Sequence, residues 1–116
     1  MASTPISGAV LIVEDPFVTG LLRSVLERKG FSVVSARAPH ALEMLRAGEV
    51  HPDLLITNSP SAFAEIGDWM PLLYLSACPD PEQVSSFRTW LSLNKPFQPR
   101  DLVDAVGDLL SCGAVK

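Results

Sequence analysis

The chain has 116 residues, of which 47% are hydrophobic and 19% are charged, and its formal net charge is -4. This length suits a single domain over residues 1–116 with one core, since a domain of this size buries roughly two-thirds of its unfolded surface. The acidic charge and the lack of a Lys/Arg cluster argue against direct nucleic-acid binding, and no apolar run approaches the ~18 residues of a membrane span. Without a signal-peptide pattern, we expect a cytoplasmic protein with no membrane partner and with Cys78 and Cys112 as reduced thiols.

The first half of the chain alternates between strand-like and helix-like segments. A β-branched run predicts a strand at Ala9–Val13, and the helix that follows begins at Pro16, a residue suited to a first helical position. Glycines predict the ends of this helix and of the next one, at Gly30 and Gly48, with a strand at 31–35 between them. The inward face of the first helix is predicted from its helical spacing to hold Val18, Leu21, Leu22, Val25 and Leu26.

The second half continues this alternation, but its crossovers are shorter. A strand is predicted at Leu54–Thr57, and the segment from 58 to 70 is close to the minimum of about a dozen residues for a crossover between parallel strands. We therefore expect a short or irregular helix at Pro60–Ile66, before a strand at 72–75. The remaining predicted elements are a helix at 79–88 with Val84 and Phe87 inward, a strand at Trp90–Asn94, and a helix from Pro99 to a stop at Gly113 with Leu102, Val103, Val106, Leu109 and Leu110 inward.

Five alternations of strand and helix predict an α/β domain with a parallel sheet, right-handed crossovers and helices on both faces. Functional sites in such open sheets gather at the carboxyl ends of the strands. The polar residues at these ends are Glu14, Asp15, Asn58, Ser76 and Lys95.

With these polar residues in this order at the ends of predicted strands, the sequence resembles the receiver domain of two-component response regulators over residues 9–110. The stretches that carry the resemblance are Val10-Leu11-Ile12-Val13-Glu14-Asp15, Pro52-Asp53-Leu54-Leu55-Ile56-Thr57-Asn58, Leu75-Ser76-Ala77 and Asn94-Lys95-Pro96-Phe97. The resemblance implies a flavodoxin-like, doubly wound five-stranded parallel sheet of strand order 2-1-3-4-5. It also implies that an acidic pair helps to bind Mg²⁺, an Asp accepts phosphate from a histidine kinase, and a hydroxyl and a lysine engage the phosphoryl oxygens.

Asn58 departs from this pattern at the phosphoacceptor position. A neutral amide is a poor nucleophile, so we predict that Asn58 is not phosphorylated, while Ser76 and Lys95 keep the places of the phosphate pocket. The loss of one negative charge also weakens cation binding, and we expect only weak Mg²⁺ binding at Glu14 and Asp15 and no other cofactor. The alternative for the acidic pair is a role at the first helix N-terminus, and we expect Lys95 to pair structurally with Asp15.

Two other departures from the family pattern concern the regions through which a receiver domain would transmit a signal to a partner. The crossover after Asn58 is short, and Ser92 stands at the switch position, where the family often has a Tyr or Phe. Phe63, Trp69 and Trp90 are candidate partner contacts, with core packing as the alternative.

The main hypothesis is an atypical, stand-alone receiver domain that acts in signal transduction through protein contacts and is not an enzyme. The expected partners are a histidine kinase, a phosphotransfer protein or an output protein, and a homodimer is left open. One alternative is a receiver that is still phosphorylated, because Asn58 is an engineered or deamidated Asp or because another residue accepts phosphate. A second alternative is a small flavodoxin-like enzyme or cofactor-binding protein, although the chain has no glycine-rich phosphate loop and no nucleophile elbow.

Overall fold

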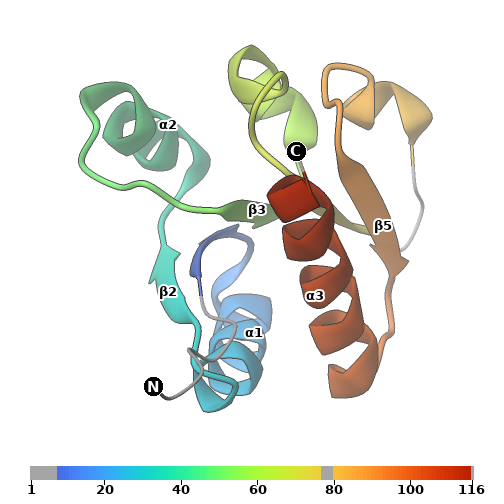
Figure 1. The fold of residues 1–116 in the computed structure, drawn as a ribbon. Coiled ribbons are helices and arrows are strands. Elements are labelled where there is room, and N and C mark those ends of the chain that lie inside the picture. The colour runs from blue at the N-terminus through green and yellow to red at the C-terminus, as the bar shows by residue number, and fades with distance from the viewer. Residues whose placement is uncertain (1–7, 77–79, 116) are drawn as a thin grey trace.

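A five-stranded parallel sheet lies at the centre of the protein, in a computed structural model that describes residues 8–76 and 80–115, with the side chains up to residue 110. The strands are β1 (Ala9–Val13), β2 (Ser32–Ser35), β3 (Leu54–Thr57), β4 (Leu72–Ser76) and β5 (Trp90–Asn94). Their order is β2-β1-β3-β4-β5, and every neighbouring pair is parallel (Figure 1). The flavodoxin-like fold and its strand order are therefore confirmed.

The helices that connect the strands differ strongly in length. They are the α-helices α1 (Pro16–Arg28), α2 (Ala38–Ala47) and α3 (Pro99–Val115) and the 3₁₀-helices η1 (Pro60–Ile66) and η2 (Pro81–Val84). Gly30 and Gly48 follow α1 and α2 with φ of 96° and 73°, a left-handed conformation that glycine adopts easily. The predicted stops at these two residues are confirmed. Among the described residues, no helix is long and apolar enough to cross a membrane.

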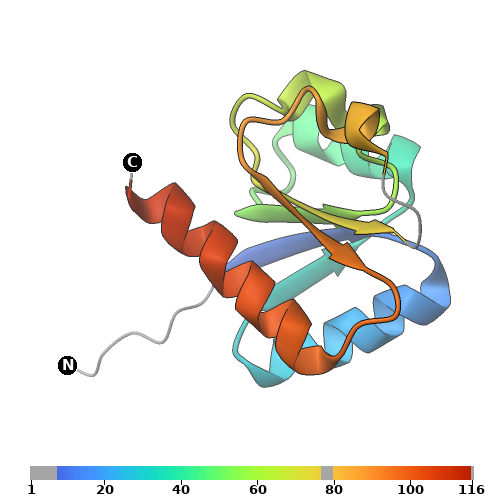
Figure 2. The ribbon, with the colours of Figure 1, turned by 90° about the vertical axis from the view of Figure 1, so that its right-hand side faces the viewer.

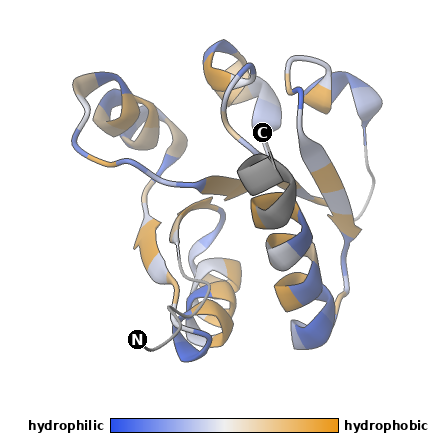
Figure 3. Ribbon diagram, viewed as in Figure 1, coloured by the Kyte–Doolittle hydropathy of each residue, from blue (hydrophilic) through white to orange (hydrophobic). Residues whose placement is uncertain are grey.

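Both faces of the sheet are covered by apolar layers. On one face, α1 and α3 pack Leu22, Leu26, Leu102 and Val106 against the strands. On the other face, α2, η1, η2 and the segment that follows η2 contribute a layer that includes Ala41, Phe63, Ile66, Val84 and Phe87. Figure 2 shows these two groups of helices on opposite sides of the sheet, and Figure 3 shows hydrophobic and hydrophilic residues alternating around α1 and α3, as expected for helices with one buried face.

The segment after β4 forms much less helix than the sequence indicates. The predicted helix at 79–88 is wrong beyond the single turn η2, although Val84 and Phe87 are buried as expected; residues 77–79 lie outside the described residues. The backbone after η2 packs tightly against Gly67, where an added Cβ would lie 1.9 Å from the carbonyl oxygen of Ser86. Tertiary contact between η1 and this segment therefore prevails over its helix propensity.

Three further details bear on the sequence prediction, of which one agrees with it and two differ. The crossover after β3 is short and irregular as predicted, because η1 is a 3₁₀-helix with non-helical backbone angles at Phe63. The predicted stop at Gly113 is wrong, since α3 continues to Val115; glycine lowers helix stability but ends a helix only where the backbone turns left-handed. Leu21 is 47% exposed rather than inward, because the buried stripe of α1 is centred on Leu22 and Leu26.

Candidate functional site

The predicted polar residues follow strands that end at one edge of the sheet. Glu14 follows β1 and Asn58 follows β3, and the last residues of these two strands, Val13 and Thr57, are register partners. Lys95 follows β5, and its backbone N–H donates to the carbonyl oxygen of Ser76 at 3.2 Å. The fold thus brings the sequence-predicted residues to the carboxyl edge of the sheet.

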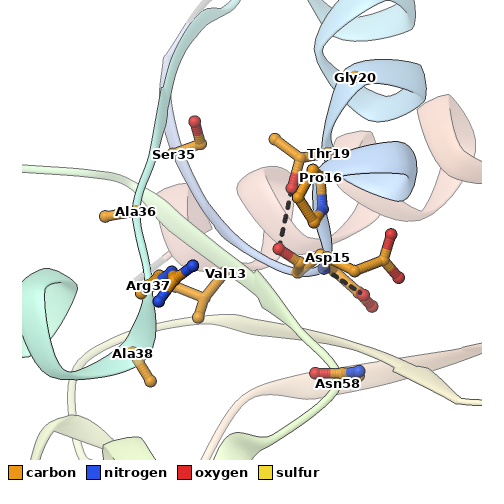
Figure 4. Close-up of a pocket in the computed structure, with 11 residues that line it drawn as sticks. Val13, Asp15, Pro16, Thr19, Gly20, Ser35, Ala36, Arg37, Ala38 and Asn58 are labelled. Carbon is orange, nitrogen blue, oxygen red and sulfur yellow. Dashed lines mark hydrogen bonds between the residues drawn. The ribbon is translucent and has the colours of Figure 1, made fainter.

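A cavity of about 580 Å³ opens at this edge beside β1, β2 and β3 (Figure 4). Glu14, Asp15 and Asn58 line it, together with Arg37 at the start of α2. Ser76 and Lys95 do not belong to its lining. The predicted constellation is therefore divided between the cavity and the β4–β5 side of the edge.

Glu14 and Lys95 form an ion pair within the site. Nζ of Lys95 lies 3.2 Å from Oε2 of Glu14, whose side chain is fully buried, whereas the Lys95 side chain is 28% exposed. The alignment of this contact is not that of a hydrogen bond, so Oε2 has no hydrogen-bond partner in the described structure and the contact is mainly electrostatic. The other carboxylate oxygen accepts from the backbone N–H of Asp15 at 3.2 Å.

Asp15 is not the partner of Lys95, contrary to the expectation from the sequence. The exposed Asp15 is the N-cap of α1, where its carboxylate accepts from the backbone N–H of Val18 at 3.0 Å. Its extended backbone turns the side chain back toward the helix and away from the buried position that Glu14 takes. The adjacent acids therefore have different contacts, one a buried ion pair and the other a helix cap.

Asn58 lies exposed at the end of β3. Its Oδ1 accepts from the hydroxyl of Ser59 at 3.1 Å, and the backbone N–H of Ser59 donates to the buried Thr57 hydroxyl at 3.0 Å. In Figure 4, Asn58 stands on the β3 side of the cavity, with Asp15, Pro16 and Thr19 on the α1 side. The geometry gives position 58 access to solvent, but the side chain there is an amide with no carboxylate nucleophile.

The oxygen donors of this site fit a magnesium ion poorly. The Glu14 carboxylate already faces the Lys95 ammonium group, and the Asp15 carboxylate accepts from the N-terminus of α1. The third oxygen, on Asn58, is neutral, while Mg²⁺ prefers carboxylate and water ligands. Among the side chains that the structure describes, in residues 8–76 and 80–110, no group of three from His, Cys, Asp or Glu is arranged to hold a metal ion.

Arg37 is a residue of the cavity that the sequence reasoning missed. It is exposed at the N-cap of α2, with no side-chain capping bond, and makes no ion pair within the described part of the chain. Its position two residues after the end of β2 is the signal that could have identified it, since residues at strand carboxyl ends converge on this edge.

The three aromatic candidates for partner contacts separate into core and surface. Phe63 is fully buried between η1 and the sheet, so its assignment as a partner contact is wrong and the core alternative holds. Trp69 is 62% exposed before β4, and Trp90 is 43% exposed at the start of β5. Ser92, at the predicted switch position, is also exposed on β5.

Comparison with known proteins identifies the fold. No protein-family model matches the chain, and no curated protein matches it. Among solved structures, a response regulator receiver protein from Sinorhizobium medicae WSM419 is 25% identical with a TM-score of 0.75, over 93% of this chain and 96% of that one. The signal receiver domain of an HD domain-containing protein from Pseudomonas fluorescens Pf-5 is 20% identical with a TM-score of 0.78, over 99% and 95% of the two chains.

A larger protein contains the same architecture as one part. NtrX from Brucella abortus, in complex with ADP, is 19% identical with a TM-score of 0.79; the match covers 95% of this chain and 28% of that one. The resemblance read from Glu14, Asp15, Ser76 and Lys95 is thus matched by the three-dimensional structure. The chain has the fold of the response regulator receiver domains.

Proposed function

We propose that this chain is a receiver-type signalling domain that acts through protein–protein contacts and does not accept phosphate at position 58. The observation that carries the proposal is Asn58, an exposed amide at the carboxyl end of β3. A carboxylate there could attack a phosphoryl group and carry it as an acyl phosphate. A neutral amide oxygen forms no comparable product.

The Glu14–Lys95 ion pair supports the same proposal. A lysine that stabilises a phosphoryl group must direct its charge toward that group, yet Nζ of Lys95 lies 3.2 Å from the carboxylate of Glu14. Moving Lys95 away would leave the buried Glu14 carboxylate without a counter-charge, which is unfavourable. The ion pair therefore favours a structural use of the lysine.

The elements around the site support an output that does not depend on phosphorylation. The crossover after Asn58 is reduced to η1, and the exposed Ser92 offers no aromatic ring whose rotamer could change with a signal. We therefore propose a binding module without enzymatic activity, with Mg²⁺ bound weakly at most. Its partners would be signalling proteins such as a histidine kinase, a phosphotransfer protein or an output protein, or a second copy of the chain.

Incubation with a small-molecule phosphodonor and Mg²⁺, followed by intact-mass measurement, tests this proposal. We expect no phosphoprotein, together with an untreated mass that matches Asn rather than Asp at position 58. A stable phosphoryl adduct on any residue would refute the proposal.

A further inference from the structure

A groove lies between the carboxyl end of α1 and the amino end of α3, away from the Asn58 cavity. Its volume is about 430 Å³. Val25 on α1 and Pro99 and Val103 on α3 provide apolar surface, and both valines are half-buried. Val25 also packs against the buried core between the helices and the sheet. The floor of the groove is thus apolar and lies on the outer side of that core.

The groove carries positive charge on an acidic protein. Arg28 and Lys29 line it from the end of α1, and Arg100 lines it from the start of α3; all three are exposed. Their convergence contrasts with the net charge of -4 for the whole chain. Opposite walls of one groove therefore present cations to the same space.

These cations are free of carboxylate partners in the described part of the chain. Four other cations each lie within 4.0 Å of a carboxylate, namely Arg23, Arg46, Arg88 and Lys95. Arg28, Lys29 and Arg100 have no such neighbour among the described residues, and of the described cations that lack one, only Arg37 lies outside the groove. Most of the unpaired positive charge of the described residues is therefore concentrated in this groove.

The acids near the groove form no ion pair with these three cations, and the charged side chains that line the groove are three cations and one acid. Asp104 lines the groove one turn after Arg100 but makes no ion pair with it. Asp101 is used at the start of α3, where its carboxylate accepts from the backbone N–H of Gln98 at 3.1 Å. Glu27, beside Arg28 in the sequence, pairs instead with Arg23 at 3.3 Å.

We propose that this groove binds an acidic amphipathic segment of a partner protein. Apolar side chains of the segment would lie between Val25 and Val103, and its Asp and Glu side chains would meet Arg28, Lys29 and Arg100. The mixture of an apolar floor and only three cations fits such a segment better than a nucleic-acid backbone, which needs an extended basic surface. The inference rests on the proposed function as a protein-contact module and names the class of one partner, but it uses no residue of the Asn58 site.

The probe for this inference is a synthetic amphipathic helical peptide with leucines on one face and glutamates on its flanks. We expect saturable binding by fluorescence anisotropy, with amide shifts in nuclear magnetic resonance spectra centred on Val25, Lys29, Arg100 and Val103. The combined substitution Arg28→Glu and Arg100→Glu should weaken binding about tenfold or more, because two attractive contacts become repulsive. The matched control Arg88→Glu, at an exposed cation outside the groove, should change the affinity less than about twofold.

A second arm keeps the protein unchanged and replaces the peptide glutamates by glutamines, which should weaken binding to a similar degree. Absence of saturable binding, equal binding of the two peptides, or an unchanged affinity in the doubly substituted protein would overturn the inference. Binding only to phosphatidylserine-containing vesicles, with none to the peptide, would assign the groove to a membrane surface and overturn it as well. Phosphodonor incubation reports phosphorylation and does not depend on peptide binding in the groove, so failure of the groove proposal and failure of the proposed function are distinguishable.

Discussion

Replacing Lys95 with methionine tests the structural role of the lysine. Met retains much of the apolar stem but removes the ammonium group that lies 3.2 Å from Oε2 of Glu14. The Glu14 side chain is fully buried, so its carboxylate would lose its counter-charge without gaining water. We therefore expect Lys95→Met to destabilise the fold.

The size of the effect follows from distance and exposure. At 3.2 Å, two unit charges attract by about 5 kcal/mol with an effective dielectric constant near 20, and desolvation offsets part of this attraction. Because the Lys95 side chain is 28% exposed, we expect a loss of about 3 kcal/mol, at the lower end for breaking a buried pair. Glu14→Gln should lose only about 1 kcal/mol, because Lys95 can turn toward solvent. The double variant should lose about 2 kcal/mol, which gives a coupling of about 2 kcal/mol between the two positions.

Equilibrium urea unfolding of the four proteins measures these values, with far-ultraviolet circular dichroism as the signal. Trp69 and Trp90 are 62% and 43% exposed in the folded state, so tryptophan fluorescence is a weaker reporter of unfolding. Additive losses in the double variant, or a loss below about 0.5 kcal/mol for Lys95→Met, would refute the structural ion pair.

The remaining predictions concern position 58, a tight glycine contact and a surface ion pair. Asn58→Asp should give a measurable gain in Mg²⁺ affinity by calorimetric titration, because it adds a carboxylate to the cavity; an unchanged titration would contradict the assigned geometry. Gly67→Ala should lose about 3 kcal/mol in urea unfolding, since its Cβ would lie 1.9 Å from a backbone oxygen, whereas the control Gly20→Ala, in open space on α1, should gain about 1 kcal/mol. The hydrogen bond from Arg46 lowers the pKa of Glu65, so the contribution of Glu65 to stability is complete above its ordinary pKa and is lost as the pH falls through its folded pKa. Glu65→Gln should therefore lower the urea midpoint at neutral pH and have less effect in acid, and a difference that widens in acid would contradict this linkage.

The parallel sheet was predictable because local sequence signals agree with the fold, whereas the order of its strands was implied by the resemblance to receiver domains. The apolar strands alternate with helices that have a proline at their first or second residue, and Gly30 and Gly48 follow the ends of α1 and α2 in the left-handed conformation. The segment around η2 was not predictable in the same way. Its path depends on Gly67, which is distant in sequence from the backbone that packs against it.

The position of the candidate site was predictable from the sequence, but the residues that form its ion pair were not. Motif order places Glu14, Asp15, Asn58 and Lys95 at one edge, because they follow strands of a parallel sheet. Which of the two adjacent acids pairs with Lys95 depends on the conformation of the backbone where it enters α1. In that conformation Asp15 is the N-cap of the helix and the Glu14 side chain is buried. The burial of Phe63 likewise depends on how η1 packs on the sheet, and periodicity alone does not determine it.

The central claim concerns the chemistry at position 58, and a side-by-side intact-mass measurement tests it most directly. The unaltered protein and the Asn58→Asp variant would be incubated with the same small-molecule phosphodonor and Mg²⁺. We predict one phosphoryl group on the variant and none on the unaltered protein, because only in the variant does the exposed end of β3 carry a carboxylate nucleophile. A phosphoryl group on the unaltered protein would contradict the account.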